Sequence, residues 1–162
     1  MNETRRAILI PLDGSEQAER ALDTARRLAI ATEATMLLIY IVPEHHDDFQ
    51  SGLAPEMNEA QRYLSEIASR VRASTNSEEH APVVLTQVCV GEPAERIVRE
   101  AELWHTDTIV MATHGRGGSG RLIHGSVADA VLRRSSVPVV LVPSRTVDTA
   151  RAPLPIGRVA LQ

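Results

Sequence analysis

The sequence predicts an α/β fold in which a five-stranded parallel sheet carries helices on both faces, as a three-layer open sandwich. Five short, largely apolar runs indicate strands, and the first two, Ala7–Leu12 and Thr35–Val42, have no polar alternation, which is typical of strands that are buried on both sides. Segments with helical periodicity separate these runs, and such alternation requires crossover helices that cover both faces of a parallel sheet. The 162 residues are 43% hydrophobic but only 2% aromatic, which favours a core of Ala, Val, Ile and Leu.

The first half of the chain begins with a strand, a helix and a second strand. Strands are expected at Ala7–Leu12 and Thr35–Val42, which are continuous apolar runs. The helix between them is expected to begin at Ser15 as its N-cap and to carry Arg26 and Arg27 in its last turn.

The rest of the chain continues the same alternation. A helix of about 18 residues follows from the 3.6-residue apolar period between Met57 and Val71, and Pro93 marks the start of the next helix. The remaining elements are a strand at Val83–Val90, a strand at Thr108–Thr113, a helix at Ser126–Arg134 and a strand at Pro138–Val142.

These elements end near residue 143, which divides the chain into two parts. Residues 1–143 are predicted to form one domain, since about 160 residues suffice for a single core. Residues 144–162 contain Pro153 and Pro155 and little periodicity, so we interpret them as a C-terminal tail that can be mobile.

Composition excludes several classes of function. The net charge of −4 provides no basic surface for a phosphate backbone, so no nucleic-acid partner is expected. Cys89 is the only cysteine, which excludes an internal disulfide and a cysteine-rich zinc site, and we interpret it as a small core residue. The first apolar run is too short for a secretion signal or a membrane span, so a cytoplasmic protein without a membrane partner is expected.

The segment from Ala112 to Ser126 carries the strongest functional signal. It contains five glycines and connects a buried strand to a helix. Glycines allow successive backbone amides to turn toward one point, and the helix N-terminus at Gly125 and Ser126 adds unpaired amides. The segment therefore predicts a cradle for a polyphosphate.

The same segment resembles the signature of the universal stress protein family, G-x-x-G-x(9)-G-[ST]. Gly115, Gly125 and Ser126 match its last three fixed positions, whereas Ala112 stands at the first. The resemblance extends from Ala7 to Pro143 and includes Pro11-Leu-Asp-Gly-Ser15 and Pro138-Val-Val-Leu-Val-Pro143. It implies a Rossmann-like fold of the adenine nucleotide alpha hydrolase-like type.

The resemblance also implies an ATP site at the carboxyl ends of the first and fourth strands, where parallel sheets bind ligands. Asp13 would accept from a ribose hydroxyl or help to hold a metal ion, with Mg or Mn expected beside the nucleotide. The residues that would line the adenosine end are Pro11, Leu12, Asp13 and Val42, and those near the ribose and phosphates are Ala112, Gly115, Arg116, Gly125, Ser126 and Val127.

Two functions remain open from the sequence. The first is a regulatory protein of the stress response that binds ATP, with weak ATPase activity at most, because the sequence lacks G-x-x-x-x-G-K-[ST] and S-G-G-x-D-S. The alternative is a dimeric interaction module that binds no nucleotide, if the methyl group of Ala112 closes the pocket.

The last apolar run predicts how the protein assembles. In the family this run forms an edge of the sheet, and an uncovered apolar edge strand invites aggregation. A homodimer with Val139 to Val142 at its centre would cover the edge, because a two-fold contact closes on itself. The alternative is that the tail from Ser144 folds back over the edge and leaves a monomer.

Overall fold

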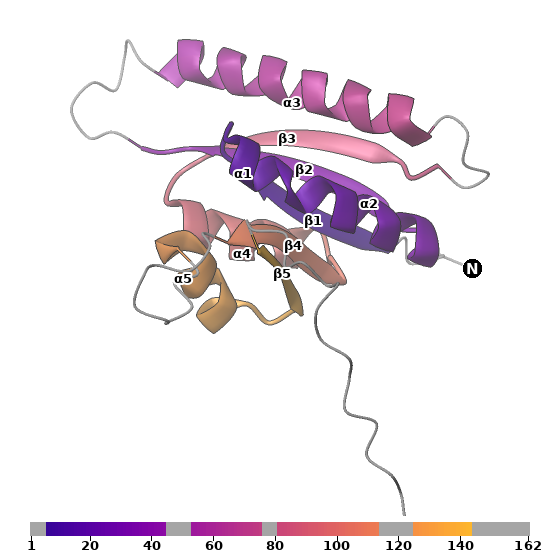
Figure 1. Ribbon diagram of the computed structural model, residues 1–162. Coiled ribbons are helices and arrows are strands. Elements are labelled where there is room, and N and C mark those ends of the chain that lie inside the picture. The colour runs from indigo at the N-terminus through magenta and orange to yellow at the C-terminus, as the bar shows by residue number, and fades with distance from the viewer. Residues whose placement is uncertain (1–5, 45–52, 76–80, 114–124, 144–162) are drawn as a thin grey trace, which may run out of the picture.

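The computed structural model describes residues 6–44, 53–75, 81–113 and 125–143, and Figure 1 shows the chain as a sheet between two groups of helices. The elements are β1 (Ala7–Leu12), α1 (Glu16–Glu19), α2 (Ala21–Thr32), β2 (Thr35–Val42), α3 (Leu53–Thr75), β3 (Val84–Val90), α4 (Pro93–Leu103), β4 (Thr108–Thr113), α5 (Ser126–Arg134) and β5 (Val139–Pro143).

All five strands are parallel and follow the order β3-β2-β1-β4-β5. The order reverses between β1 and β4, which are neighbours in the sheet although they are far apart in the chain. This reversal confirms that the loops after the first and fourth strands lie at the switch point, where α/β sheets bind their ligands.

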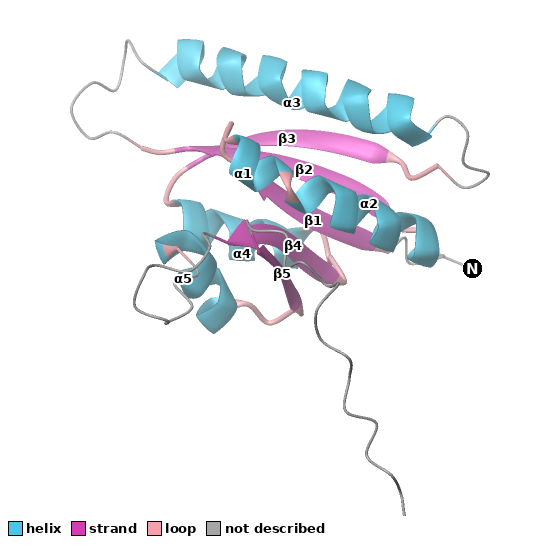
Figure 2. Ribbon diagram, viewed as in Figure 1, coloured by secondary structure: helices cyan, strands magenta, loops and turns pink. Residues whose placement is uncertain are grey.

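Helices cover both faces of the sheet, as Figure 2 shows. Side chains such as Ile10 and Leu38 pack on the face of α2 and α3, where Leu64 of α3 is fully buried. Leu9 and Ile39 pack on the opposite face with residues of α4 and α5. The predicted three-layer α/β sandwich is confirmed. Within the described residues, none of the helices is long and apolar enough to span a membrane.

The helices differ from the sequence prediction more than the strands do. The first predicted helix is divided at Arg20 into α1 and α2, and α2 continues to Thr32. Arg26 and Arg27 therefore lie in the middle of α2, so the prediction that they occupy its last turn was wrong. The second predicted helix extends for 23 residues, beyond the buried stripe that marked it, because exposed residues at its ends continue the helix without apolar periodicity.

Candidate functional site

The loop after β1 is held in place by local side-chain hydrogen bonds. Ser15 is the N-cap of α1, as predicted, and its Oγ accepts from the amide of Ala18 at 3.1 Å. Asp13 Oδ1 accepts from the amide of Ser15 at 3.0 Å and from its hydroxyl at 2.6 Å. Gly14 has a φ of 83°, a left-handed conformation that favours glycine. The carboxylate of Asp13 is thus fixed beside the carboxyl end of β1.

A hydrogen bond joins this loop to the end of β4. Gln17 of α1 donates from Nε2 to the carbonyl oxygen of Thr113 at 3.1 Å. Thr113 is the last residue of β4, so the contact connects the two strands across the switch point. The loop after β1 therefore lies beside the carboxyl end of β4.

Among the described residues, the N-terminus of α5 has no side-chain cap of the kind that α1 and α4 possess. Gly125 is its N-cap, with a φ of 80° and no side-chain hydrogen bond to the first turn, whereas Glu92 caps α4 by accepting from the amide of Glu95. The first amides of a helix have no partner within the helix and carry the positive end of its dipole. Such a terminus attracts an anionic group.

A cavity of about 380 Å³ opens where these features meet. This volume falls within the range of about 300 to 1,000 Å³ that is usual for small-molecule sites. Seven of the ten residues predicted for the ATP site line the cavity, namely Pro11, Leu12, Asp13, Ala112, Gly125, Ser126 and Val127.

The other three predicted residues do not contribute to the described cavity wall. Val42 is buried and faces a neighbouring hollow of about 300 Å³, while Ile41 lines the cavity in its place. Successive side chains of a strand point to opposite faces of the sheet, so Ile41 and Val42 lie on different faces. Gly115 and Arg116 lie outside the described residues.

Besides Ala18 of α1 and Ala128 of α5, three elements contribute cavity residues that the sequence reasoning missed. Tyr40 and Pro43 come from the end of β2 and the residue after it, and Met111 comes from β4. Pro93 and Ile97 come from the first two turns of α4. A signal for α4 was available, because Pro93 begins a helix directly after a strand, and that helix starts at the same edge of the sheet as the loops after β1 and β4.

Tyr40 connects the cavity with the neighbouring hollow, since it lines both. Its hydroxyl donates to the carbonyl oxygen of Asp13 at 3.4 Å, and its ring meets that of Tyr63 edge to face, with 5.9 Å between the centroids. Burial raises the pKa of the Tyr40 phenol, and the charges of Asp13, Glu59 and Glu56 add to this shift. The phenol therefore stays neutral at physiological pH and serves as a hydrogen-bond donor.

The described residues contain no cluster of three or more His, Cys, Asp or Glu side chains that could hold a metal ion by themselves. Asp13 uses Oδ1 for the turn, and its Oδ2 makes no hydrogen bond within the described part of the chain. A cation at this point would therefore need further ligands, such as the oxygens of a bound phosphate group.

Comparisons with known proteins identify the family of the chain. The family model described as the universal stress protein family matches residues 4–143. The Thermus aquaticus universal stress protein of the QAH/OAS sulfhydrylase 3′ region is 33% identical over 140 residues, which cover 85% of this chain and 98% of the relative.

Solved structures share the fold. A universal stress protein from Archaeoglobus fulgidus has a TM-score of 0.68 at 24% identity, with 85% of this chain and 97% of that chain covered. A universal stress protein solved in complex with cAMP has a TM-score of 0.67 at 25% identity, with 87% and 98% covered. From the family match and the Thermus relative, this chain belongs to the universal stress protein family.

Proposed function

We propose that the protein binds ATP in the cavity at the β1–β4 switch point as a regulatory ligand in the stress response, with slow hydrolysis or none. The observation that carries this proposal is the uncapped N-terminus of α5, which opens onto a cavity of nucleotide size. The universal stress protein solved with cAMP supports an adenine nucleotide as the class of ligand.

The walls of the cavity suit the two ends of a nucleotide. Pro11, Ile41 and Ile97 form an apolar part in which an adenine ring can be buried. Ser126 and Val127 belong to the first turn of α5, where phosphate oxygens can accept from backbone amides. Asp13 lies on the same cavity wall and can accept from a ribose hydroxyl or contact a phosphate-bound Mg²⁺ or Mn²⁺ ion through Oδ2.

The basic residues favour binding over phosphoryl transfer. All 17 are arginines, so the chain contains no lysine of the kind that reaches the terminal phosphates in P-loop enzymes. The nucleotide would then act by stabilising the conformation that binds it.

Calorimetry with ATP and Mg²⁺ tests the proposal. We expect a dissociation constant between millimolar and micromolar, which corresponds to a binding free energy of about 4 to 8 kcal/mol in favour of the complex. If no heat appears at high protein concentration, ATP binding is excluded, and the nucleotide-free interaction module, with Ala112 closing the pocket, takes its place.

Ser126→Glu and Ser126→Gln form a matched pair that tests the phosphate position. A carboxylate in the first turn stabilises a helix, so Ser126→Glu should fold, yet it should repel the phosphates and weaken ATP binding about tenfold or more relative to Ser126→Gln. Adenosine, which lacks phosphate, should bind both variants similarly. If the two variants bind ATP with equal affinity, the phosphates do not lie at the start of α5.

We also propose that the protein is a homodimer with Val139 to Val142 at its interface. β5 is an edge strand of the sheet, and these four side chains are only partly buried in the single chain. Light scattering should give the mass of a dimer for the parent and of a monomer for Val140→Lys, because a two-fold contact would bury two lysines. A monomeric parent at high micromolar concentration contradicts this interface.

A further inference from the structure

An ion pair on α4 contains a buried carboxylate that is bonded to the edge strand β3, while its arginine side chain is 25% exposed. Arg96 Nη2 lies 2.8 Å from Glu100 Oε1, and only 3% of the Glu100 side chain is exposed. Glu100 Oε2 accepts from Nε2 of Gln87 on β3 at 2.9 Å. Gln87 Oε1 accepts in turn from Nε1 of Trp104, directly after α4, at 2.8 Å. These contacts form a continuous polar network between the helix and the strand.

The surroundings of Arg96 are adapted to this network. Gly91 has a φ of 141°, and a Cβ there would lie 3.0 Å from Cγ of Arg96, so the glycine leaves space for the arginine. Nε of Arg96 is buried without a hydrogen-bond partner among the described residues. Burial of a charged pair is costly, and apolar residues of similar volume are often equally or more stabilising. A gain in stability therefore does not explain the pair.

The other contacts of α4 with the core are apolar. Ala94, Ile97 and Ala101 are buried on the α4 and α5 face of the sheet. Apolar contacts are not directional, and small side chains permit a helix to slide or rotate at little cost. Hydrogen bonds are directional, so the bonds of Glu100 and Gln87 define the position of α4 along β3.

That position determines one wall of the proposed nucleotide cavity. Pro93 and Ile97, which line the cavity, lie on the same helix as Arg96 and Glu100. Because a short helix moves as a rigid body, a displacement at Glu100 also moves both of these cavity residues.

We propose that Arg96 and Glu100 are positioning residues that fix the α4 wall of the ligand cavity; this inference rests on the proposed function. The main role of the pair is then to support ligand affinity, and its contribution to the stability of the fold is secondary. The chain offers a control, because Asp129 and Arg133 form an exposed pair with the same spacing on α5, the other helix at the cavity.

The test replaces the buried pair with apolar residues in Arg96→Met/Glu100→Leu. We expect a melting temperature equal to or above that of the parent and an ATP affinity at least about fivefold lower, measured by calorimetry. The control Asp129→Asn/Arg133→Gln removes one charge of each sign and leaves the net charge of α5 unchanged, so it should bind ATP within about twofold of the parent. If the double variant does not fold, Glu100→Gln is tested for ATP affinity alone, because removing one charge of the pair is expected to lower its stability.

Trp104 gives a second readout that needs no nucleotide. It is the only tryptophan, so its emission reports the position of the end of α4 directly. We expect the emission maximum of the folded double variant to differ from that of the parent, whereas the α5 control keeps it. If the parent binds ATP and the double variant binds within twofold of it, the positioning role is excluded. If the parent binds no ATP, the proposed function is contradicted instead. In that case, a double variant whose Trp104 emission maximum equals that of the parent excludes the displacement of α4.

Discussion

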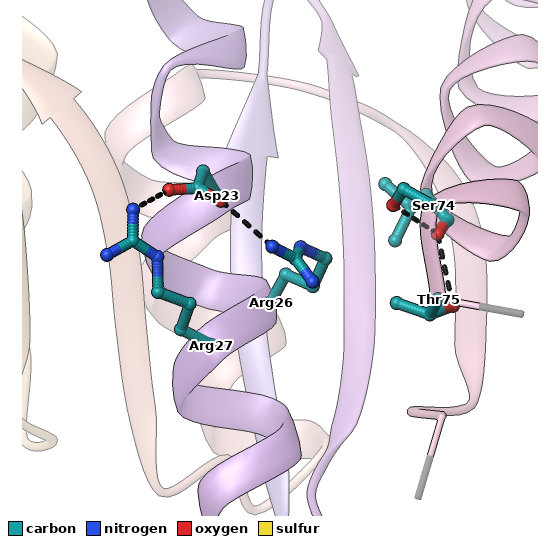
Figure 3. Close-up of polar contacts among 6 residues, drawn as sticks. Asp23, Arg26, Arg27, Ser74 and Thr75 are labelled. Atoms are coloured by element: carbon teal, nitrogen blue, oxygen red, sulfur yellow. Dashed lines mark hydrogen bonds and ion pairs between the residues drawn. The ribbon is translucent and has the colours of Figure 1, made fainter. Parts of the chain in front are cut away.

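α2 and α4 lie on opposite faces of the sheet, and both carry arginine and acidic side chains at helical spacing, but in different surroundings. In α2, Asp23 accepts from Arg26 at 3.1 Å and also pairs with Arg27 (Figure 3). The side chain of Asp23 is 53% exposed. In α4, the Glu100 side chain is 3% exposed and bonded to β3. The same sequence pattern therefore produces a solvated pair in one helix and a fixed contact in the other.

The neighbouring helix α3 shows how little polar bonding the α2 side requires. Ser74 and Thr75, in its last turn, direct their hydroxyls to the carbonyl oxygen of Val71 within the same helix (Figure 3). The packing of this face relies on buried apolar residues such as Leu64 and Ile67. On this face Tyr63 of α3 donates to Glu19, which belongs to α1, and Arg70 of α3 pairs with the same carboxylate.

Glu100→Gln should have the largest effect. Removing one charge of a buried pair leaves the other uncompensated, so we expect the free energy of unfolding to fall by about 3 kcal/mol. Urea unfolding measures this loss, with Asp129→Asn as the exposed control. If both substitutions have equally small effects, burial does not distinguish the two kinds of pair.

Tyr63→Phe should have an intermediate effect. The hydroxyl of Tyr63 donates to Glu19 Oε1 at 3.2 Å, and Glu19 also pairs with Arg70 of α3. Losing one such hydrogen bond should lower the free energy of unfolding by about 1 kcal/mol. A loss as large as that of Glu100→Gln would contradict the view that this face depends on apolar packing.

The phenols also predict a dependence on alkaline pH. Burial raises the pKa of Tyr63, and Glu19 raises it further, while the pKa of Tyr40 is raised as well. The folded state thus retains protons that the unfolded chain loses near pH 10. The associated stability is fully present below pH 10 and decreases as the pH rises above it. Unfolding measured between pH 9 and 11 should show this decrease, and Tyr63→Phe should reduce it.

The inner strands β1 and β2 could be predicted from the sequence to the residue because each is a continuous apolar run. The same feature concealed which face each side chain occupies. Since both faces of β2 are buried, nothing in the sequence distinguishes Ile41 from Val42. The resemblance placed Val42 near the base, whereas Ile41 lines the described cavity wall. Strands with polar alternation would have revealed the face.

The ion pair on α4 was hidden for a related reason. The apolar stripe of this helix comprises Ala94, Ile97, Val98 and Ala101, and Glu100 lies within its buried side, where a carboxylate is not expected. Its partner Gln87 belongs to β3, the element directly before α4, but only the packing of α4 on β3 brings the two side chains together. Sequence periodicity records burial of apolar residues and carries no information about such pairs.

Asp23→Asn should have the smallest effect, and its pH dependence has the opposite sign to that of the tyrosines. The hydrogen bond from Arg27 holds the pKa of Asp23 below its ordinary value near 3.8. Its stabilisation is therefore present above pH 3.8 and is lost as the pH falls through the lower pKa of the folded state. Because the carboxylate is exposed, water and salt screen the pair, and we expect the melting temperature at neutral pH to fall by about 1 °C or less. Calorimetric scans in low and high salt measure the change, which should vanish in about 1 M salt. A decrease comparable with that of Glu100→Gln, or one that persists in high salt, would show that the exposed pair on α2 also fixes the position of its helix.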